Sequence, residues 1–242
     1  MLRIATTLGR RLVASRFGAV LRPVALRVAD GLALRAVDRN VHHRLGPAGA
    51  PPTSRVVGLT VVRDAEPFLA EFLAHHRRLG VEHVVFLDSG STDGTLDLLA
   101  AERGVTVLAT ALPFGLWQAR LRRWLFARHV GAGRWGLALD VDEFLDWPGS
   151  THLGLAGLLD YLEGTGCTAL AAYLLDLFPR GPLVAATGPM RDSHVWYDLD
   201  DVADERYGPP GNVVPDARIV HRRGGVRRRA FGTRPLLTKH PL

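Results

Sequence analysis

The chain has 242 residues, of which 47% are hydrophobic, and a formal net charge of +6. This length allows one α/β domain with an appendage, and the composition argues against both a disordered chain and a membrane-embedded bundle. The single cysteine, Cys167, excludes an internal disulfide and is typical of a protein in a reducing compartment.

The positive charge is confined to the two ends of the chain. Residues 1–52 hold nine arginines against two aspartates, a net charge of +7, and residues 212–242 carry the same net charge. Residues 53–211 hold 13 basic and 21 acidic residues, a net charge of −8. Because the body of the protein is acidic, we expect no nucleic-acid partner. Acidic centres are typical of enzymes that hold a divalent cation with carboxylates.

Residues 1–45 predict a basic amphipathic helical segment, since apolar residues recur near helical spacing between arginines. No uninterrupted apolar stretch approaches the roughly 20 residues of a membrane span. Three interpretations stay open: a helix on an anionic membrane surface, a helix packed on its own domain, or an organellar presequence. We expect a cytoplasmic protein, with peripheral contact to an anionic membrane under the first interpretation.

A Gly- and Pro-rich stretch predicts a linker over residues 46–54, followed by a domain over residues 55–242. The apolar run 56–62 predicts a buried strand, and a helix with an apolar face should follow it and stop at Gly80. Further strands are expected at 83–87, 105–109, 135–139 and 169–177, and helices at 95–102, 115–130 and 153–162. This alternation predicts an α/β fold with a parallel sheet covered on both faces, and a less regular part after residue 178.

Three acidic residues are expected at the carboxyl ends of strands, where ligands bind in such sheets. They are Asp64 after the first strand of the domain, Asp88 after the second and Asp140 after the fourth. Asp140 and Asp142 are two residues apart, so on an extended segment both would face one ion. Magnesium and manganese prefer such oxygen ligands, and a cation would relieve the repulsion between the carboxylates. The sequence therefore predicts one metal-dependent site.

Residues 88–95, Asp-Ser-Gly-Ser-Thr-Asp-Gly-Thr, form a second candidate motif. Its glycines allow a tight turn, and Ser91 or Thr92 is suited to cap the helix expected after it. An ordinary capped turn would explain each of these residues except Asp88. We expect the Asp88 carboxylate to lack protein partners until a ligand binds, and Asp93 to support the turn.

Taken together, three segments resemble family 2 glycosyltransferases of the GT-A fold, in the branch related to family 92. The segments are Val-Val-Arg-Asp-Ala-Glu at 61–66, Phe-Leu-Asp-Ser-Gly-Ser-Thr-Asp-Gly-Thr at 86–95 and Leu-Asp-Val-Asp-Glu-Phe-Leu at 139–145. The resemblance covers residues 55–177 and implies a Rossmann-like, mostly parallel sheet with helices on both faces. It implies a transferase that moves a sugar from a nucleotide-diphosphate donor to an acceptor hydroxyl.

The resemblance also assigns roles to residues. Asp88 matches the acid that contacts the donor nucleoside, with Arg63, Asp64 and Gln118 also at the donor. Asp142 matches the acid that binds a manganese or magnesium ion bridging the diphosphate, and Asp140 its partner near the ribose and the ion. Inverting enzymes of this type use an acid downstream as general base, for which Asp198 is our choice among Asp192, Asp198, Asp200, Asp201 and Glu205.

The resemblance further implies a glycan or lipid-linked acceptor, as in the synthesis of cell-surface glycans or glycolipids. The family pattern near residues 237–242 continues further than this chain, which leaves a naturally short protein or a fragment as alternatives. A catalytically inactive sugar-nucleotide-binding protein is a competing interpretation. A sugar nucleotidyltransferase is a weaker one, because residues 62–66 lack the glycine-rich basic loop of those enzymes.

Overall fold

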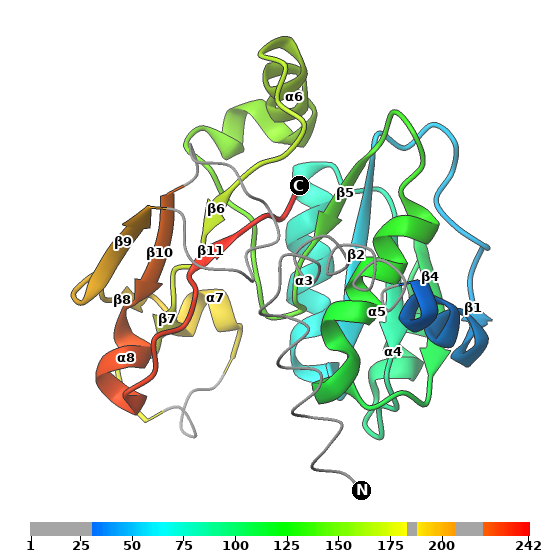
Figure 1. Ribbon diagram of the computed structural model, residues 1–242, viewed down its shortest axis with the longest axis horizontal. Coiled ribbons are helices and arrows are strands. Elements are labelled where there is room, and N and C mark those ends of the chain that lie inside the picture. The colour runs from blue at the N-terminus through cyan, green and yellow to red at the C-terminus, as the bar shows by residue number, and fades with distance from the viewer. Residues whose placement is uncertain (1–30, 183–187, 207–219) are drawn as a thin grey trace, which may run out of the picture.

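The computed structural model describes residues 31–182, 188–206 and 220–242. A larger part is built around one five-stranded sheet, and a smaller lobe consists of short antiparallel strand pairs with two short helices (Figure 1). The chain passes through the larger part first and then enters the lobe, from which its C-terminal residues return to the larger part (Figure 1).

The larger part follows the expected order of strands and helices. Its elements are β1 (Val41–Leu45), β2 (Val56–Val62), α3 (Glu66–Leu79), β3 (Val84–Asp88), α4 (Thr95–Ala101), β4 (Val105–Thr110), α5 (Phe114–His129), β5 (Trp135–Ala138) and α6 (Ser150–Gly164). The strand order is β1-β4-β3-β2-β5. Strands β2, β3, β4 and β5 are parallel, and β1 runs antiparallel to β4.

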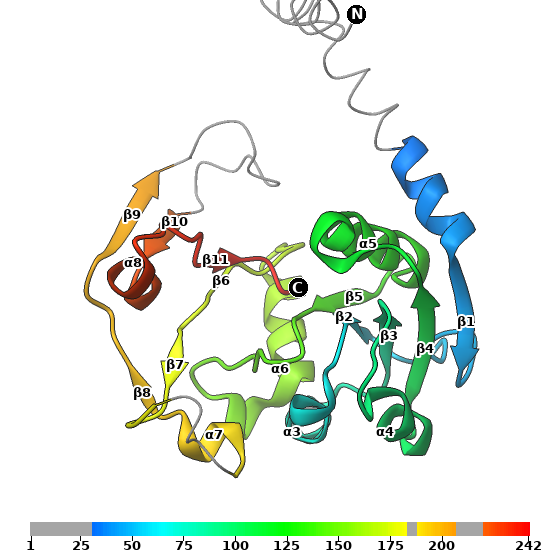
Figure 2. The same cartoon turned by 90° about the horizontal axis from the view of Figure 1, so that it is seen from below.

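Strands β2, β3 and β4 are buried along their whole length because helices cover both faces of the sheet. Helices α3, α4 and α6 pack on one face, through Leu69, Leu99 and Leu159 among others. Helix α5 packs on the other face through Leu121 and Leu125. Figure 2 shows the helices on opposite sides of the sheet, so the expected mostly parallel, doubly covered sheet is confirmed. No helix in the described ranges is both long and apolar enough to cross a bilayer.

The N-terminal boundary differs from the expectation. Residues 31–40 are helical, and Val37 is fully buried in the cluster formed with α5. Residues 41–45 are not helical but form β1, in which Val41 pairs with Thr110 of β4. The expected linker at 46–54 joins two strands of one sheet, and Thr106 Oγ1 donates a hydrogen bond of 2.7 Å to the Pro47 carbonyl. Residues 31–54 thus belong to the same folded unit as the main sheet, while residues 1–30 of the helical segment expected over residues 1–45 fall outside the described residues.

The residues expected to form the last strand of the sheet belong to the smaller lobe instead. It contains β6 (Ala172–Tyr173), β7 (Leu177–Phe178), α7 (Met190–Ser193), β8 (Trp196–Tyr197), β9 (Val202–Arg206), β10 (Val220–Gly224), α8 (Val226–Phe231) and β11 (Thr238–Lys239). The expected strand over residues 169–177 is wrong, since only β6 and β7 form there and neither joins the main sheet. Tyr173, Leu175 and Leu177 are all exposed, so this apolar run is not covered by helices.

The C-terminal residues return to the main sheet. Strand β11 pairs with β6, and the Ala138 N–H donates to the Pro241 carbonyl at 2.7 Å. Leu242 is buried in the same apolar cluster as α3 and α6. Because Ala138 is the last residue of β5, this segment runs past the carboxyl end of that strand (Figure 1).

Candidate functional site

The order of the parallel strands reverses between β2 and β5. The chain moves outward from β2 to β3 and β4, and then returns to the other side of β2 to form β5. Connections therefore diverge at the carboxyl ends of β2 and β5, which is where open α/β sheets bind ligands. Arg63 and Asp64 directly follow β2, and Asp140 lies two residues after β5.

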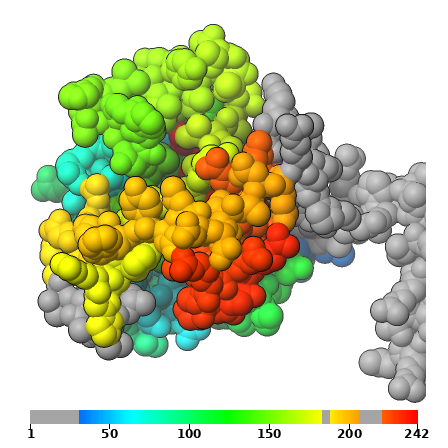
Figure 3. All heavy atoms as spheres, turned by 90° about the vertical axis from the view of Figure 1, so that its left-hand side faces the viewer, coloured from blue at the N-terminus to red at the C-terminus, as the bar shows by residue number. Residues whose placement is uncertain are grey.

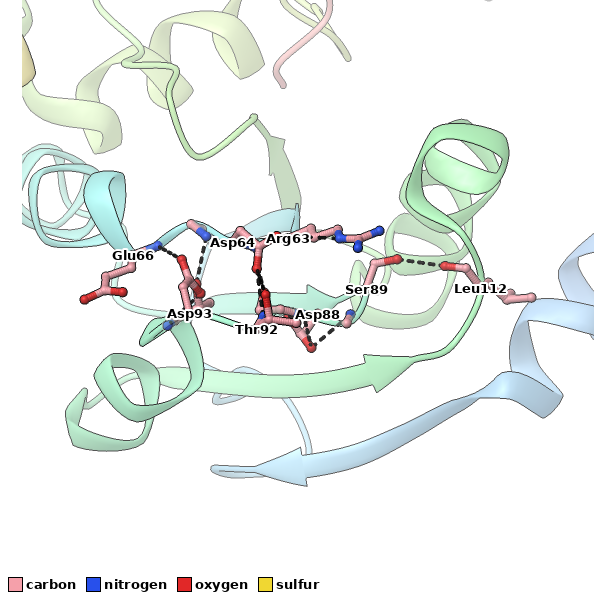
Figure 4. A network of polar contacts seen from close by, with 12 residues as sticks. Arg63, Asp64, Glu66, Asp88, Ser89, Thr92, Asp93 and Leu112 are labelled. Carbon is pink, nitrogen blue, oxygen red and sulfur yellow. Dashed lines mark hydrogen bonds and ion pairs between the residues drawn. The ribbon is translucent and has the colours of Figure 1, made fainter. Parts of the chain in front are cut away.

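The turn after β2 is locked onto the turn after β3 (Figure 4). Asp64 has a left-handed backbone conformation, with φ of 51°. Its Oδ1 accepts hydrogen bonds from the Thr92 N–H at 2.7 Å and the Thr92 hydroxyl at 3.2 Å. The Asp64 N–H donates to the Ser91 hydroxyl at 2.8 Å. Arg63 is exposed, with its Nε 3.6 Å from Asp64 Oδ2, so the two predicted donor residues of this turn lie together.

Asp88 is buried and satisfied by its own loop. It is 3% exposed, its Oδ2 accepts the Gly90 N–H at 3.2 Å, and its Oδ1 accepts the Ser91 N–H at 3.1 Å. Gly90 has a φ of 84°, a conformation that glycine adopts without strain. The expectation that the Asp88 carboxylate lacks protein partners is therefore wrong. Its hydrogen bonds shape the loop that any ligand at β3 would meet.

The start of α4 is capped differently from the expectation. Asp93 Oδ1 accepts the Thr95 N–H at 3.0 Å, and Asp93 Oδ2 accepts the Glu66 N–H at 3.1 Å. Glu66 in turn accepts the Gly94 N–H at 2.8 Å. The predicted capping role of Ser91 or Thr92 is wrong, because both bind Asp64, whereas the predicted role of Asp93 in the turn is confirmed. Desolvation raises the pKa of Asp93, but hydrogen bonds from Thr95 and Glu66 outweigh it and lower this pKa.

Asp140 and Asp142 lie on a turn rather than on an extended strand. The Glu143 N–H donates to the Asp140 carbonyl at 3.0 Å, and the Asp140 N–H donates to Glu143 Oε2 at 3.2 Å. The argument that both aspartates face one side of a strand is therefore wrong. Asp142 is exposed, and no other residue of 31–182, 188–206 or 220–242 donates a hydrogen bond to it.

Two cations hold the Asp140 carboxylate, and neither was expected from the sequence. Arg122 of α5 forms an ion pair with Asp140 Oδ1. Lys239 of β11 places its Nζ 3.1 Å from Asp140 Oδ2 and also pairs with Glu143. Burial lowers the pKa of Arg122, and the negative charges of Glu143 and Asp142 oppose this effect. Sequence separations of 18 and 99 residues hide these contacts from any local motif.

These residues can hold a divalent cation only with help from a ligand. Among the residues that the structure describes, no three His, Cys, Asp or Glu side chains are grouped to bind a metal. Asp140 and Asp142 nevertheless provide carboxylate oxygens at one turn, which is the donor set that magnesium uses when phosphates and water complete its shell. The donor set fits a hard cation, provided that Lys239 gives up its place on Asp140.

A histidine pair on α3 holds the segment that carries these carboxylates. His75 Nε2 donates to the Leu145 carbonyl at 2.7 Å, because its Nδ1 accepts from Arg191 at 2.8 Å. His76 lies beside it and stacks on Phe144 with parallel ring planes, 6.4 Å between centroids. Burial lowers the pKa of His76 to about 4. Both histidines are therefore neutral structural groups that pack residues 144–145 against α3.

Two predicted residues remain, one on α5 and one in the smaller lobe. Gln118 is half-buried in α5. Asp198 follows β8 in the smaller lobe, where it pairs with Arg229 of α8 and accepts the Asp200 N–H at 2.8 Å. Figure 3 shows this lobe from outside, with α8 at its surface. Within the described residues, no hydrogen bond or ion pair joins Asp198 to the Asp140 turn.

Two comparisons with known proteins find no match to this chain. A scan of the chain against models of protein families finds no match, and a search of curated proteins finds none either. The resemblance to family 2 glycosyltransferases therefore rests on the sequence motifs of this chain alone.

Proposed function

We propose that this protein is an inverting, divalent-metal-dependent glycosyltransferase of the GT-A type, which transfers a sugar from a nucleotide-diphosphate sugar to an acceptor hydroxyl. One observation carries the proposal: the acidic turns after β2, β3 and β5 all follow the carboxyl ends of parallel strands at one edge of the sheet, beside the point where the strand order reverses. Such an edge accommodates a nucleotide. The three turns are also the three segments that resemble the family.

In this proposal the turns on the two sides of this reversal have different tasks. The interlocked turns with Arg63, Asp64 and Asp88 would receive the nucleoside, and Gln118 of α5 would approach the donor. Asp140 and Asp142 would hold the manganese or magnesium ion. When bound, that ion would neutralise the charge that grows on the leaving diphosphate. Asp198 could serve as general base only after its ion pair with Arg229 opens, because a carboxylate held by a guanidinium accepts a proton poorly.

The acceptor would be a large or membrane-bound molecule. A glycan or lipid-linked acceptor follows from the resemblance, as does a place in polysaccharide or glycolipid synthesis. The nine arginines of residues 1–52 would favour contact with an anionic membrane surface in the cytoplasm.

A catalytically inactive sugar-nucleotide-binding protein is the second candidate. The ion pairs that Asp140 makes with Arg122 and Lys239 favour it, because they neutralise the carboxylate that should hold the metal. A sugar nucleotidyltransferase gains no such support, since Arg63 and Asp64 follow β2 without a glycine-rich loop.

Ligand-induced stabilisation and turnover together test the proposal. The full chain would be heated with UDP-, GDP- and dTDP-sugars, with and without manganese, because a bound ligand raises the melting temperature by mass action. We expect one nucleotide class to stabilise the protein only when manganese is present. Release of the nucleoside diphosphate would then identify an enzyme, whereas stabilisation without release would favour the binding protein. The absence of any stabilisation would contradict both candidates.

A further inference from the structure

Lys239 is the only lysine among the 30 lysine and arginine residues of the chain. This one ammonium group lies at the candidate site, 3.1 Å from Asp140 Oδ2 and paired with Glu143. A lysine carries a compact charge on a flexible stem that turns between partners, whereas an arginine presents a rigid planar fork. The chain thus has its single mobile ammonium on the carboxylate that a metal ion would need.

The backbone on either side of Lys239 is fixed. The Leu237 N–H donates to the Arg222 carbonyl at 2.7 Å, and the Ala138 N–H donates to the Pro241 carbonyl at 2.7 Å. Lys239 itself pairs with Ala172 in the β11–β6 ladder. Its side chain is 31% exposed. A change of partner at Asp140 therefore requires only a rotation of this side chain.

Because of the charges around Asp140, the binding of the divalent cation and the binding of the donor diphosphate should depend on each other. Three carboxylates, on Asp140, Asp142 and Glu143, face the two cations of Arg122 and Lys239, a formal net charge of −1. That charge repels a diphosphate, and a divalent cation would change it to +1. A cation needs the Asp140 oxygen that Lys239 occupies, and it brings phosphate oxygens that can accept from the displaced ammonium.

We propose that Lys239 competes with the divalent cation for Asp140 and, once displaced, binds the diphosphate of the donor. This inference rests on the proposed function and adds the order in which Lys239 changes its partner. Lys239 holds Asp140 in the empty protein, and it turns to a phosphate oxygen when cation and nucleotide bind. Arg122 keeps Asp140 Oδ1 throughout and preserves the orientation of the carboxylate. Cation and nucleoside diphosphate consequently bind well together and poorly alone.

Opposite effects of one substitution test this inference. Calorimetric titrations of the full chain would measure the binding of manganese alone, and of UDP, GDP and dTDP in saturating manganese. Lys239→Gln should bind manganese alone about five- to tenfold more tightly, because a competing charge is gone. It should bind the diphosphate about five- to tenfold more weakly, because a phosphate contact is gone. Effects in the same direction, or no effect, would overturn the inference.

A matched control removes the same charge elsewhere. Arg234 is exposed and pairs with Glu205 at 3.1 Å in the smaller lobe. Arg234→Gln should leave both affinities unchanged, which separates a contact at Asp140 from a general change in net charge. If the wild-type chain binds neither manganese nor any of the diphosphates, the proposed function and this inference fail together. If it binds both and Lys239→Gln binds them equally well, only the inference fails.

The wild-type chain offers a second readout that needs no substitution. Lys239 supplies the only side-chain amine, so acylation with an amine reagent can be read at one position by mass spectrometry, relative to the N-terminal amine. Manganese alone should raise the acylation rate of Lys239 several-fold, since its carboxylate partner is taken. Added UDP, GDP or dTDP should lower the rate again. A rate that manganese leaves unchanged, in a protein that binds manganese, would refute the competition.

Discussion

Removing the Asp88 carboxylate should destabilise the protein by an amount that follows from its hydrogen bonds. Asp88 is 3% exposed and accepts the backbone N–H groups of Gly90 and Ser91. Asp88→Ala would leave two donors in the loop without this acceptor; because Gly90 is exposed and Ser91 half-buried, water replaces part of each bond, and each loss costs about 0.5–1.5 kcal/mol. The expected total of about 1–3 kcal/mol corresponds to a melting temperature lower by about 2–12 °C for a chain of this size. Asp88→Asn keeps one acceptor oxygen and should lose about half as much.

Thermal and urea unfolding would measure this loss, and calorimetry below the melting temperature would measure nucleotide affinity in the same variants. Asp97→Asn is the control, because Asp97 is exposed on the adjacent helix α4 and should change stability by less than about 0.5 kcal/mol. An unchanged melting temperature for Asp88→Ala would refute the assignment of its hydrogen bonds. Unchanged nucleotide affinity in the folded variant would remove the Asp88 loop from the donor site.

Three further predictions concern the core, the metal and the response to pH. Val37→Ala should lower the free energy of unfolding by about 2 kcal/mol in urea titrations, since Val37 is fully buried. Leu32→Ala is the control, because Leu32 is 60% exposed. Equal losses in the two variants would contradict the packing of helix 31–40 on the domain through Val37. Asp142→Asn should abolish the manganese dependence of nucleotide binding in calorimetry. Asp146→Asn is the control and should leave this dependence unchanged, because the asparagine keeps an oxygen for the hydrogen bonds from Trp147 and Ser150. Equal effects of the two substitutions would indicate only a general acidic surface. Because burial lowers the pKa of His76 from 6.5 to about 4, the unfolded chain takes up a proton at a higher pH than the folded protein does. Stability should thus be complete above pH 6.5 and fall by about 3 kcal/mol as the pH drops from 6.5 to 4, and urea titrations of His76→Gln should show a weaker pH dependence if this assignment holds.

The elements of the main sheet were predictable because their signals are local. Strand β2 is an unbroken apolar run, and α3 ends at Gly80, whose φ of 107° suits the left-handed cap. The turns at Asp64 and Asp88 were expected at strand ends, and the structure has them there. In each case a few adjacent residues determine both the element and its end.

Residues 31–54 and 169–177 were harder to predict because their neighbours decide their structure. Strand β1 exists through pairing with β4, some 65 residues away in the sequence. The apolar run containing Tyr173 and Leu177 resembles a buried strand, yet no helix of the described chain covers it. Apolar spacing reveals a surface that can be buried, but it does not identify what buries it.

The candidate site was also predictable only in part, because contacts between distant residues determine the chemistry of its carboxylates. Local motifs pointed to the carboxylates but could not indicate that Asp64 and Asp88 are already satisfied by backbone donors. Hydrogen bonds from neutral N–H groups favour the ionised form of these carboxylates and fix their orientation before a ligand binds. Asp142 is exposed and accepts no hydrogen bond from another described residue, and Asp140 is held by Arg122 and by Lys239, of which Lys239 is the side chain that we propose a ligand displaces. Ligand-dependent change should therefore concentrate on the turn after β5, while the turns after β2 and β3 stay as they are in the empty protein.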